Sequence, residues 1–330
     1  MMQLPIRPRR NRKSVAIRGM MSETSLSAKH LICPVFVHEG AEDEPIESLP
    51  GCHRWSLQGL LGYCQHLLSL GVTCIDLFAV VPDEKKDEQG TEAWNPQGIV
   101  PRAIRLLKQE LPAMTVMTDV ALDPFSTYGH DGLVEEQADG SLKILNDETV
   151  IALCKQALAH AEAGADIISP SDMMDGRIAA LRAALDEAGY SEVSLMSYTA
   201  KYASALYGPF RGALGSAPKH GDKKTYQMDP ANAREALREA ALDEAEGADF
   251  LMVKPASYYL DVIAALRAQS RLPIAAYQVS GEYLMIKAAA ASGWLDEREV
   301  MLESLLSIRR AGADMILTYA AAQVAAYLKD

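Results

Sequence analysis

The sequence predicts an α/β fold built around a parallel sheet, and three observations support this. Short apolar, β-branched runs occur eight times along the chain. Longer segments in which apolar residues recur with helical spacing separate these runs. The triplet Gly-Ala-Asp stands three times at the junction between such a segment and the next run. Continuous apolar strands that alternate with amphipathic helices are typical of a parallel sheet covered on both faces.

The apolar runs have the length of strands in a parallel sheet. They are Leu31–Val37, Cys74–Val80, Met114–Val120, Asp166–Ser171, Val193–Thr199, Phe250–Pro255, Ile274–Ser280 and Met315–Ala320. Eight strand–helix units favour a closed (β/α)8 barrel of the TIM type, with an open doubly wound sheet as the alternative.

The segments between the runs have the spacing of amphipathic helices. The clearest are Thr149–Ala163, Arg177–Ala188, Ala233–Glu246, Tyr259–Gln269 and Arg298–Ala311. The triplet at 164–166, 247–249 and 312–314 fits the end of a helix, because glycine adopts the left-handed conformation that stops it. Its recurrence at fixed places supports the alternation of helices and strands.

The first 30 residues differ from the rest of the chain. Residues 1–20 hold six basic residues and no acid, so the net charge of −12 for the whole chain becomes −18 once these six are set aside. A body so acidic argues against nucleic-acid binding. The prolines and the lack of periodicity also make a transit peptide a weak interpretation. We therefore expect residues 1–30 to form an extended N-terminal arm for subunit packing, and residues 31–330 to form one catalytic barrel domain.

The cysteines and the hydropathy pattern bear on the compartment. Five cysteines are dispersed, with no closely spaced pair, which predicts free thiols in a reducing environment. The chain shows no apolar stretch of about 18 residues and no secretory signal pattern. These features predict a cytoplasmic protein without a membrane partner.

Two lysines stand at the predicted carboxyl ends of successive strands. They are Lys201, in SYTAKYAS, and Lys254, in FLMVKPAS. In a barrel the active site lies at this end of the strands. One such lysine is often a packed or salt-bridged residue. Two ammonium groups facing the same dry pocket lower each other's pKa, which would leave a neutral amine able to attack a carbonyl.

The loop that follows Lys201 suggests how a substrate is held. Residues 207–228 contain four glycines, two prolines and several cations. Long loops of this kind in compact domains are often lids, and the cations suggest an anionic, carboxylate-bearing substrate. A solvated charged loop is the alternative.

The segment DVALDPFSTYGHDG, residues 119–132, is rich in carboxylates. Carboxylates this dense suit a hard cation such as Mg²⁺. The Asp-Pro and Gly-His-Asp-Gly pairs are equally typical of turns, and spacing alone favours the turn.

Together these stretches resemble the porphobilinogen synthase (5-aminolevulinate dehydratase) family over essentially the whole chain. The matching stretches are RPRR, CPVFV, DVALDPFSTYGHDG, SPSDMMDGR, SYTAKYAS, YGPFRGA, TYQMDP, FLMVKPA, YQVSGEY and RAGADMILTYA. The resemblance implies a TIM barrel with an arm around a neighbouring subunit, usually in a homo-octamer. It implies an enzyme of tetrapyrrole (heme) biosynthesis, a lyase that condenses two 5-aminolevulinate molecules with loss of two waters.

The resemblance also implies roles for individual residues. Lys254 matches the lysine that forms the Schiff base with the substrate giving the propionyl side, and Lys201 the lysine that binds the other substrate. Ser280 and Tyr319 match the residues that hold the first carboxylate. Arg211, Lys223 and Gln227 match the residues that hold the carboxylate of the second substrate. Tyr207 and Phe210 match the aromatic lid residues, and Ser171 and Asp119 match residues that line the pocket.

The chain departs from part of the family at the metal site. Zinc-dependent relatives have three cysteines where this chain has Ala121, Asp123 and Asp131. Carboxylates suit magnesium rather than zinc, so we expect no catalytic Zn²⁺, and we leave open whether Asp123 and Asp131 bind an ion. Lys223 replaces a frequent arginine and so loses the bidentate fork. Glu239 matches the ligand of an allosteric Mg²⁺.

Two rival interpretations remain at this stage. The first is a class I aldolase-like Schiff-base barrel, which needs one imine lysine and usually recognises phosphate. The second is a non-catalytic barrel that serves binding or regulation. The second strand-end lysine and the lid sequence argue against the first, and retention of both lysines argues against the second.

Overall fold

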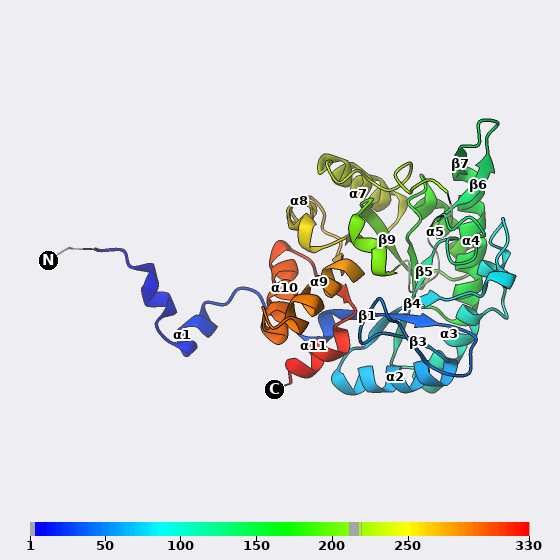
Figure 1. Cartoon of the computed structure of the whole chain (residues 1–330). Coiled ribbons are helices and arrows are strands. Elements are labelled where there is room, and N and C mark those ends of the chain that lie inside the picture. Colours follow the sequence, from blue (N-terminus) through cyan, green and yellow to red (C-terminus); the bar gives the residue numbers. More distant parts are fainter. Residues whose placement is uncertain (1–3, 211–217, 219, 330) are drawn as a thin grey trace.

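A computed structural model describes residues 4–210, 218 and 220–329, and it shows a closed barrel (Figure 1). The eight barrel strands are β1 (Leu31–Val37), β4 (Cys74–Ala79), β5 (Thr115–Val120), β8 (Ile167–Pro170), β9 (Ser194–Lys201), β10 (Phe250–Lys254), β11 (Ile274–Gln278) and β12 (Met315–Thr318). They pair in parallel in this order, and β12 pairs with β1 to close the ring. The predicted (β/α)8 TIM barrel is therefore confirmed, and the open sheet is excluded.

The helices form a layer around the strands. They are α2 (Leu57–Leu70), α3 (Ile99–Glu110), α4 (Asn146–Ala163), α5 (Arg177–Glu187), α7 (Arg234–Glu246), α8 (Leu260–Gln269), α9 (Ser280–Ala291), α10 (Glu297–Ala311) and α11 (Ala321–Tyr327). Helix α3 shows why they pack this way: Val100, Ile104 and Leu107 share one face and are buried, while charged residues cover the other face.

The Gly-Ala-Asp triplets stabilise the end of the barrel opposite the predicted active site. Gly164, Gly247 and Gly312 have φ values of 104°, 101° and 123°, which a residue with a Cβ rarely adopts. The aspartate two residues later accepts a backbone N–H bond from the start of a neighbouring strand. For Asp166 the donor is Val116 N at 2.7 Å, and Asp249 and Asp314 accept in the same way from Leu195 N and Ile274 N. The repeat therefore joins adjacent strands at the amino-terminal face of the barrel.

Some elements lie outside the predicted alternation. A short ribbon, β2 (Glu44–Pro45) and β3 (His53–Trp55), adds to the edge of β1. A hairpin of β6 (Leu133–Glu136) and β7 (Leu142–Leu145) projects from the loop after β5. Strand β9 also runs two residues beyond the predicted end at 199, so Lys201 lies in the strand itself.

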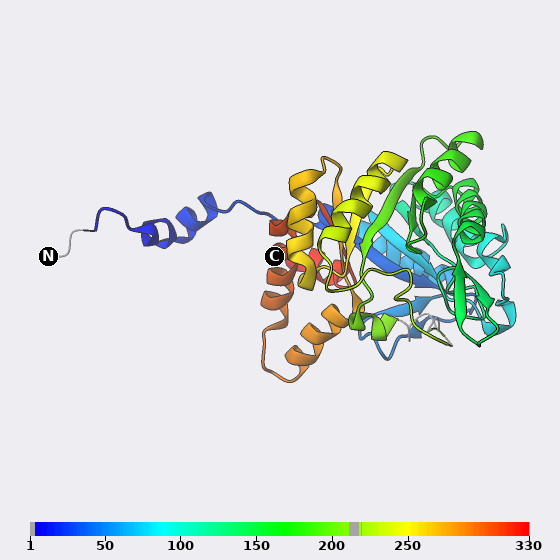
Figure 2. The same cartoon turned by 90° about the horizontal axis from the view of Figure 1, so that it is seen from above.

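The N-terminal segment extends away from the barrel (Figure 2). It contains a 3-10 helix, Pro8–Arg12, and the short α1 (Val15–Met20), neither of which has a buried residue. Ile6, Val15 and Met20 are 80%, 77% and 84% exposed. These three apolar side chains are thus left largely uncovered by the described part of the chain. Within that part, no helix is long and apolar enough to span a membrane.

Candidate active site

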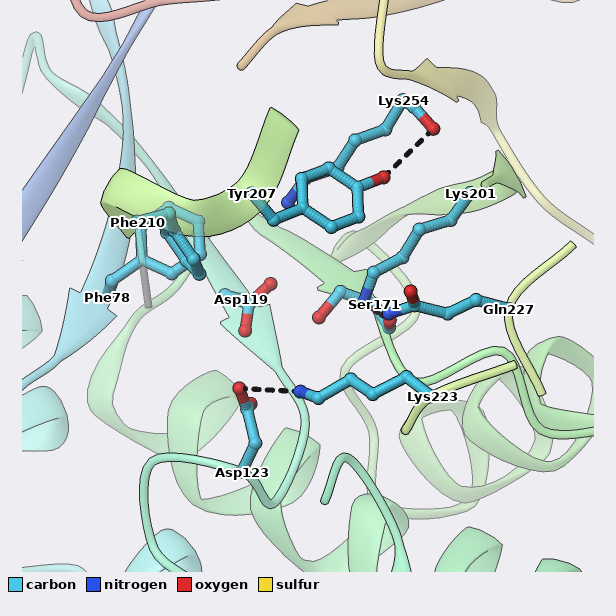
Figure 3. Close-up of a pocket in the computed structure, with 10 residues that line it drawn as sticks. All are labelled: Phe78, Asp119, Asp123, Ser171, Lys201, Tyr207, Phe210, Lys223, Gln227 and Lys254. Atoms are coloured by element: carbon cyan, nitrogen blue, oxygen red, sulfur yellow. Dashed lines mark hydrogen bonds and ion pairs between the residues drawn. The ribbon is translucent and has the colours of Figure 1, made fainter. Parts of the chain in front are cut away.

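A pocket opens where the barrel strands end, and ten residues of the described chain line it (Figure 3). They are Phe78, Asp119, Asp123, Ser171, Lys201, Tyr207, Phe210, Lys223, Gln227 and Lys254. They come from four barrel strands and from the loops after β5, β8 and β9. Both predicted lysines are among them. Lys201 and Lys254 are register partners in the β9–β10 ladder, so their side chains enter the same pocket from adjacent strands.

Lys254 lies in an aromatic environment. Its Nζ is 4.4 Å from the ring centroid of Tyr277, 4.9 Å from that of Tyr198 and 5.1 Å from that of Phe210. No ion pair joins it to any residue that the structure describes. Burial, and then the neighbouring Lys201, lower the pKa of Lys254 to about 7. An appreciable fraction of the side chain is therefore a neutral amine near neutral pH.

Lys201 lies in a cluster of charges instead. Its Nζ donates to Asp131 Oδ2 at 3.0 Å and to the carbonyl of Ser171. Asp131 also accepts a bond from Lys223 Nζ at 2.5 Å, and Lys223 donates to Asp123 Oδ2 at 3.2 Å. Burial alone would raise the pKa of Asp131, but the two lysines hold it well below its usual range. The cluster therefore carries two ammonium groups and two carboxylates in a dry environment.

This geometry bears on the metal question. The ammonium of Lys223 lies between the carboxylates of Asp123 and Asp131. Across residues 4–210, 218 and 220–329, no group of three or more His, Cys, Asp or Glu side chains is arranged to hold a metal. In this arrangement the carboxylates of Asp123 and Asp131 bind the ammonium group of the protein's own Lys223.

Asp119 faces the pocket from β5. Burial raises its pKa to about 7, against the lowering effect of Lys254. Its Oδ1 has no hydrogen-bond partner among the described residues. A carboxyl group that titrates near neutral pH beside an amine can both donate and accept a proton. Asp119 therefore has the properties of an acid–base group for chemistry at Lys254.

Residues 205–210 cover the mouth of the pocket. The ring of Phe210 packs edge-on against Phe78, with centroids 5.3 Å apart, and its backbone N–H donates to Ser280 Oγ at 3.1 Å. The Tyr207 hydroxyl donates to the carbonyl of Lys254 at 3.2 Å. The enclosed space is only about 30 Å³, enough for one or two water molecules. An organic substrate therefore needs more room than the described residues leave in the pocket.

Not every predicted site residue lines the pocket. Ser280 is fully buried behind the covering segment, and Tyr319 shares a hydrogen bond of 3.1 Å with the hydroxyl of Tyr277. Arg211 lies outside the described residues. Glu239, on α7, borders a separate cavity of about 480 Å³ that also contains Asp175 and Glu235.

Sequence reasoning missed several residues of the site. Phe78 lines the pocket, and Tyr198, Tyr277 and Asp76 lie beneath it, all within barrel strands. Two signals were available. Asp76 is a lone acid in an apolar strand, and Asp76 and Phe78 share one face of β4 because side chains alternate along a strand.

The fold and the site together define a class: a barrel protein whose pocket holds two buried lysines from adjacent strands, one with a pKa lowered to about 7, beside a buried carboxyl group with a pKa raised to about 7. The family model of delta-aminolevulinic acid dehydratase matches residues 5–327. The chain belongs to the delta-aminolevulinic acid dehydratase family, whose members are also named porphobilinogen synthases. It is accordingly a lyase of porphyrin biosynthesis that forms porphobilinogen.

Individual relatives support this over nearly the full length. The chain is 61% identical over 326 residues to the chloroplastic delta-aminolevulinic acid dehydratase of Physcomitrium patens, with 98% of this chain and 74% of the relative covered. It is 60% identical to that of Selaginella martensii, with coverages of 99% and 78%. The crystal structure of the Toxoplasma gondii enzyme in complex with the reaction product porphobilinogen superposes with a TM-score of 0.96 at 52% identity, covering 98% of this chain and 92% of that one.

The comparisons correct the predicted compartment. Relatives at 57–61% identity from mosses, lycophytes and flowering plants are named chloroplastic enzymes, so the expectation of a cytoplasmic protein is wrong. The five cysteines are free, as expected. Free thiols indicate a reducing environment, but they do not distinguish one reducing compartment from another.

Proposed function

We propose that the chain condenses two 5-aminolevulinate molecules by covalent catalysis, with Lys254 as the attacking amine and Lys201 as the lysine of the second substrate. The observation that carries this is the contrast between the two lysines: Lys254 lies among aromatic rings with a pKa lowered to about 7, whereas Lys201 is bonded to Asp131. Only a neutral amine attacks a ketone. Lys254 is therefore ready to react first.

The first half of the reaction follows from this arrangement. The amine of Lys254 adds to the ketone of one 5-aminolevulinate, and loss of water gives an imine that withdraws electrons from the adjacent carbon. Asp119, whose pKa is raised to about 7, is placed to move protons during these steps. The second substrate binds beside Lys201, where Lys223 and Gln227 line the wall.

The carboxylates of the two substrates need separate binding groups. For the second substrate we assign Lys223, Gln227 and Arg211. When the carboxylate arrives, Lys223 must share its charge between the substrate and its present partners, Asp123 and Asp131. For the first substrate we assign Ser280 and Tyr319, which become accessible when Phe210 moves away and releases Ser280 Oγ.

Trapping with borohydride tests the assignment. Borohydride reduces an imine to a stable amine, so wild-type enzyme incubated with isotope-labelled 5-aminolevulinate should carry the label on the peptide containing Lys254. A Lys254→Met variant should carry none there, while Lys201→Met should still be labelled at Lys254. Label that remains on Lys201 alone in the wild type would reverse the two roles.

The metal and the assembly are further parts of the proposal. We propose Mg²⁺ as an allosteric ion at Glu239, because the cavity beside it offers the carboxylate oxygens that Mg²⁺ prefers. Chelation followed by added Mg²⁺ should stimulate porphobilinogen formation in the wild type but not in Glu239→Gln, and added Zn²⁺ should have no such effect. Activity that depends on Zn²⁺ would contradict this assignment.

We also propose a homo-octamer in which residues 1–30 pack against a neighbouring subunit. The exposed apolar side chains of the arm support this. Sedimentation of the full chain and of a variant lacking the arm would test it, since the truncated form should assemble into smaller species. The chloroplastic relatives support a plastid as the place of action.

A further inference from the structure

A buried carboxyl group beneath the pocket has no part in the chemistry described so far. Asp76, on β4, is 0% exposed and interrupts a strand whose other residues are apolar. Its Oδ2 accepts a hydrogen bond from the Tyr198 hydroxyl at 3.1 Å, and its Oδ1 has no partner among the described residues. Leaving one buried oxygen without a hydrogen-bond partner lowers the stability of the folded state. An apolar residue would avoid this cost, which indicates a function for the carboxyl group.

One aromatic ring separates Asp76 from Lys254. The Nζ of Lys254 lies 4.9 Å from the ring centroid of Tyr198, and the hydroxyl of the same ring bonds Asp76. The two charges also act on each other: Lys254 lowers the pKa of Asp76, and Asp76 raises that of Lys254. Because both groups are buried, little solvent screens this interaction.

Other ionisable groups face Asp76 from neighbouring elements. They are Asp119 on β5, Tyr198 on β9, Lys254 on β10, Tyr277 on β11, Tyr319 after β12 and Cys74 on β4 itself. Burial, and then the charge of Asp119, raise the pKa of Asp76 well above its usual range. The carboxyl group of Asp76 therefore favours its neutral, protonated form more than an exposed aspartate does, and an appreciable fraction of Lys254 beside it is neutral near pH 7. Once the nitrogen of Lys254 becomes cationic, Asp76 can lose its proton and carry the balancing negative charge.

We propose that Asp76 is a positioning residue for Lys254: from the core side of the barrel, it provides the carboxylate that balances the positive charge of the imine formed on this lysine. The inference rests on the proposed role of Lys254. In net terms, a neutral carbinolamine and a neutral carboxylic acid give an iminium cation, a carboxylate and water. The C–O bond breaks, the nitrogen lone pair completes the C=N bond, and the proton of Asp76 is taken up in the water.

The Asp76→Asn variant tests the proposal, because it keeps the shape of the side chain and an acceptor for Tyr198 but cannot become negative. Cyanoborohydride trapping with 5-aminolevulinate is measured at Lys254 across the neutral and alkaline range. A nearby carboxylate raises the pKa of an iminium. The pH at which trapping falls to half should therefore drop by roughly one unit in the variant, and kcat should fall more than KM changes.

Two further variants make the result decisive. Asp243→Asn is the matched control, because Asp243 is also a buried carboxyl that accepts a side-chain hydroxyl bond, from Ser197 at 2.6 Å, but it lies beside Arg177 rather than beneath Lys254. It should leave the half-trapping pH unchanged. Tyr198→Phe removes the link to Asp76 and should lower the half-trapping pH by a smaller amount, so it decides the matter if Asp76→Asn does not fold.

The outcomes separate the two proposals. If the pH of half-maximal trapping is the same in wild type and Asp76→Asn, the role of Asp76 is overturned. If Asp76→Asn does not fold, the same result in wild type and Tyr198→Phe overturns it. Wild-type enzyme that forms no adduct at Lys254 at any pH would instead overturn the proposed function on which this inference rests.

Discussion

Lys201 and Lys254 are partners in the same ladder, yet the structure surrounds them with opposite environments. Lys254 has aromatic rings around its amine and a pKa lowered to about 7. Lys201 has a buried carboxylate 3.0 Å from its Nζ. The comparison shows that the surrounding side chains decide how each of two identical lysines on adjacent strands behaves. Aromatic rings prepare the amine of Lys254 to react, whereas carboxylates hold that of Lys201 in a charged network.

The largest expected effect comes from removing the reactive amine. Lys254→Met keeps the length of the side chain but loses the nucleophile, and we expect porphobilinogen formation to fall by about 10⁴-fold or more. Lys254→Arg is the matched control, because it restores a cation without an attacking amine, and it should be equally inactive. Substantial activity in either variant would show that the two lysines do not differ as described.

Removing a carboxylate from the charged network around Lys201 should lower the free energy of unfolding. Asp131→Ala leaves the buried cations of Lys201 and Lys223 without their shared partner, and the free energy of unfolding should fall by about 3–5 kcal/mol. Asp123→Ala should cost less, because Lys223 retains Asp131. Denaturant unfolding of both variants measures this, and equal losses would contradict the central place of Asp131.

The same network predicts a pH dependence of stability. The pKa of Asp131 is lowered in the folded state, so its contribution is complete above the unfolded value of about 3.8 and is lost as the pH falls through the lower folded value. The difference in stability between wild type and Asp131→Ala should therefore shrink in acid below about pH 4. A difference that stays constant down to strongly acid conditions would rule out this linkage.

The pH profile of turnover sharpens the comparison further. Lys254 must lose a proton to attack, so activity should rise with pH through about 7. Asp119 must hold a proton to act as an acid, and its pKa is also raised to about 7, so activity should fall again above that range. Asp119→Asn should lower kcat by about 10²–10⁴-fold and remove the alkaline limb. If the fall in activity at alkaline pH persists in Asp119→Asn, a group other than Asp119 causes it.

The smallest effect is expected at the mouth of the pocket. Phe210→Ala removes the ring that packs on Phe78 and lies 5.1 Å from Lys254. More water would then reach the amine, and we expect kcat to fall by about 10-fold or less, with KM raised more than kcat is lowered. Phe36→Leu is a control within the same aromatic cluster but outside the pocket lining. A larger loss in the control would indicate a packing effect.

The fold was predictable because its signals are local and repeated. Eight apolar runs and the Gly-Ala-Asp triplets predict the alternation, and the aspartates of those triplets proved to bond the neighbouring strands. The hairpin β6–β7 was missed because each of its strands has only 4 residues, too few for a clear pattern of apolar and polar residues. The arm was expected from composition alone.

The site was predictable only in part, for a different physical reason. Sequence reasoning placed both lysines in one mouth, but it could not tell which was neutral, since that depends on groups far apart in the chain. Asp131 reaches Lys201 across 70 residues and Lys223 across 92. Tyr198 and Tyr277, which surround Lys254, were indistinguishable from core residues until the barrel closed.

A direct titration of Lys254 tests the central claim. Competitive labelling of amines as a function of pH, with the peptide containing Lys254 quantified by mass spectrometry, gives the midpoint at which this side chain becomes nucleophilic. The structure predicts a midpoint near the pKa of about 7. A midpoint near the ordinary lysine value of 10.5 would mean that the aromatic environment does not prepare the amine, and the contrast between the two lysines would no longer explain the chemistry.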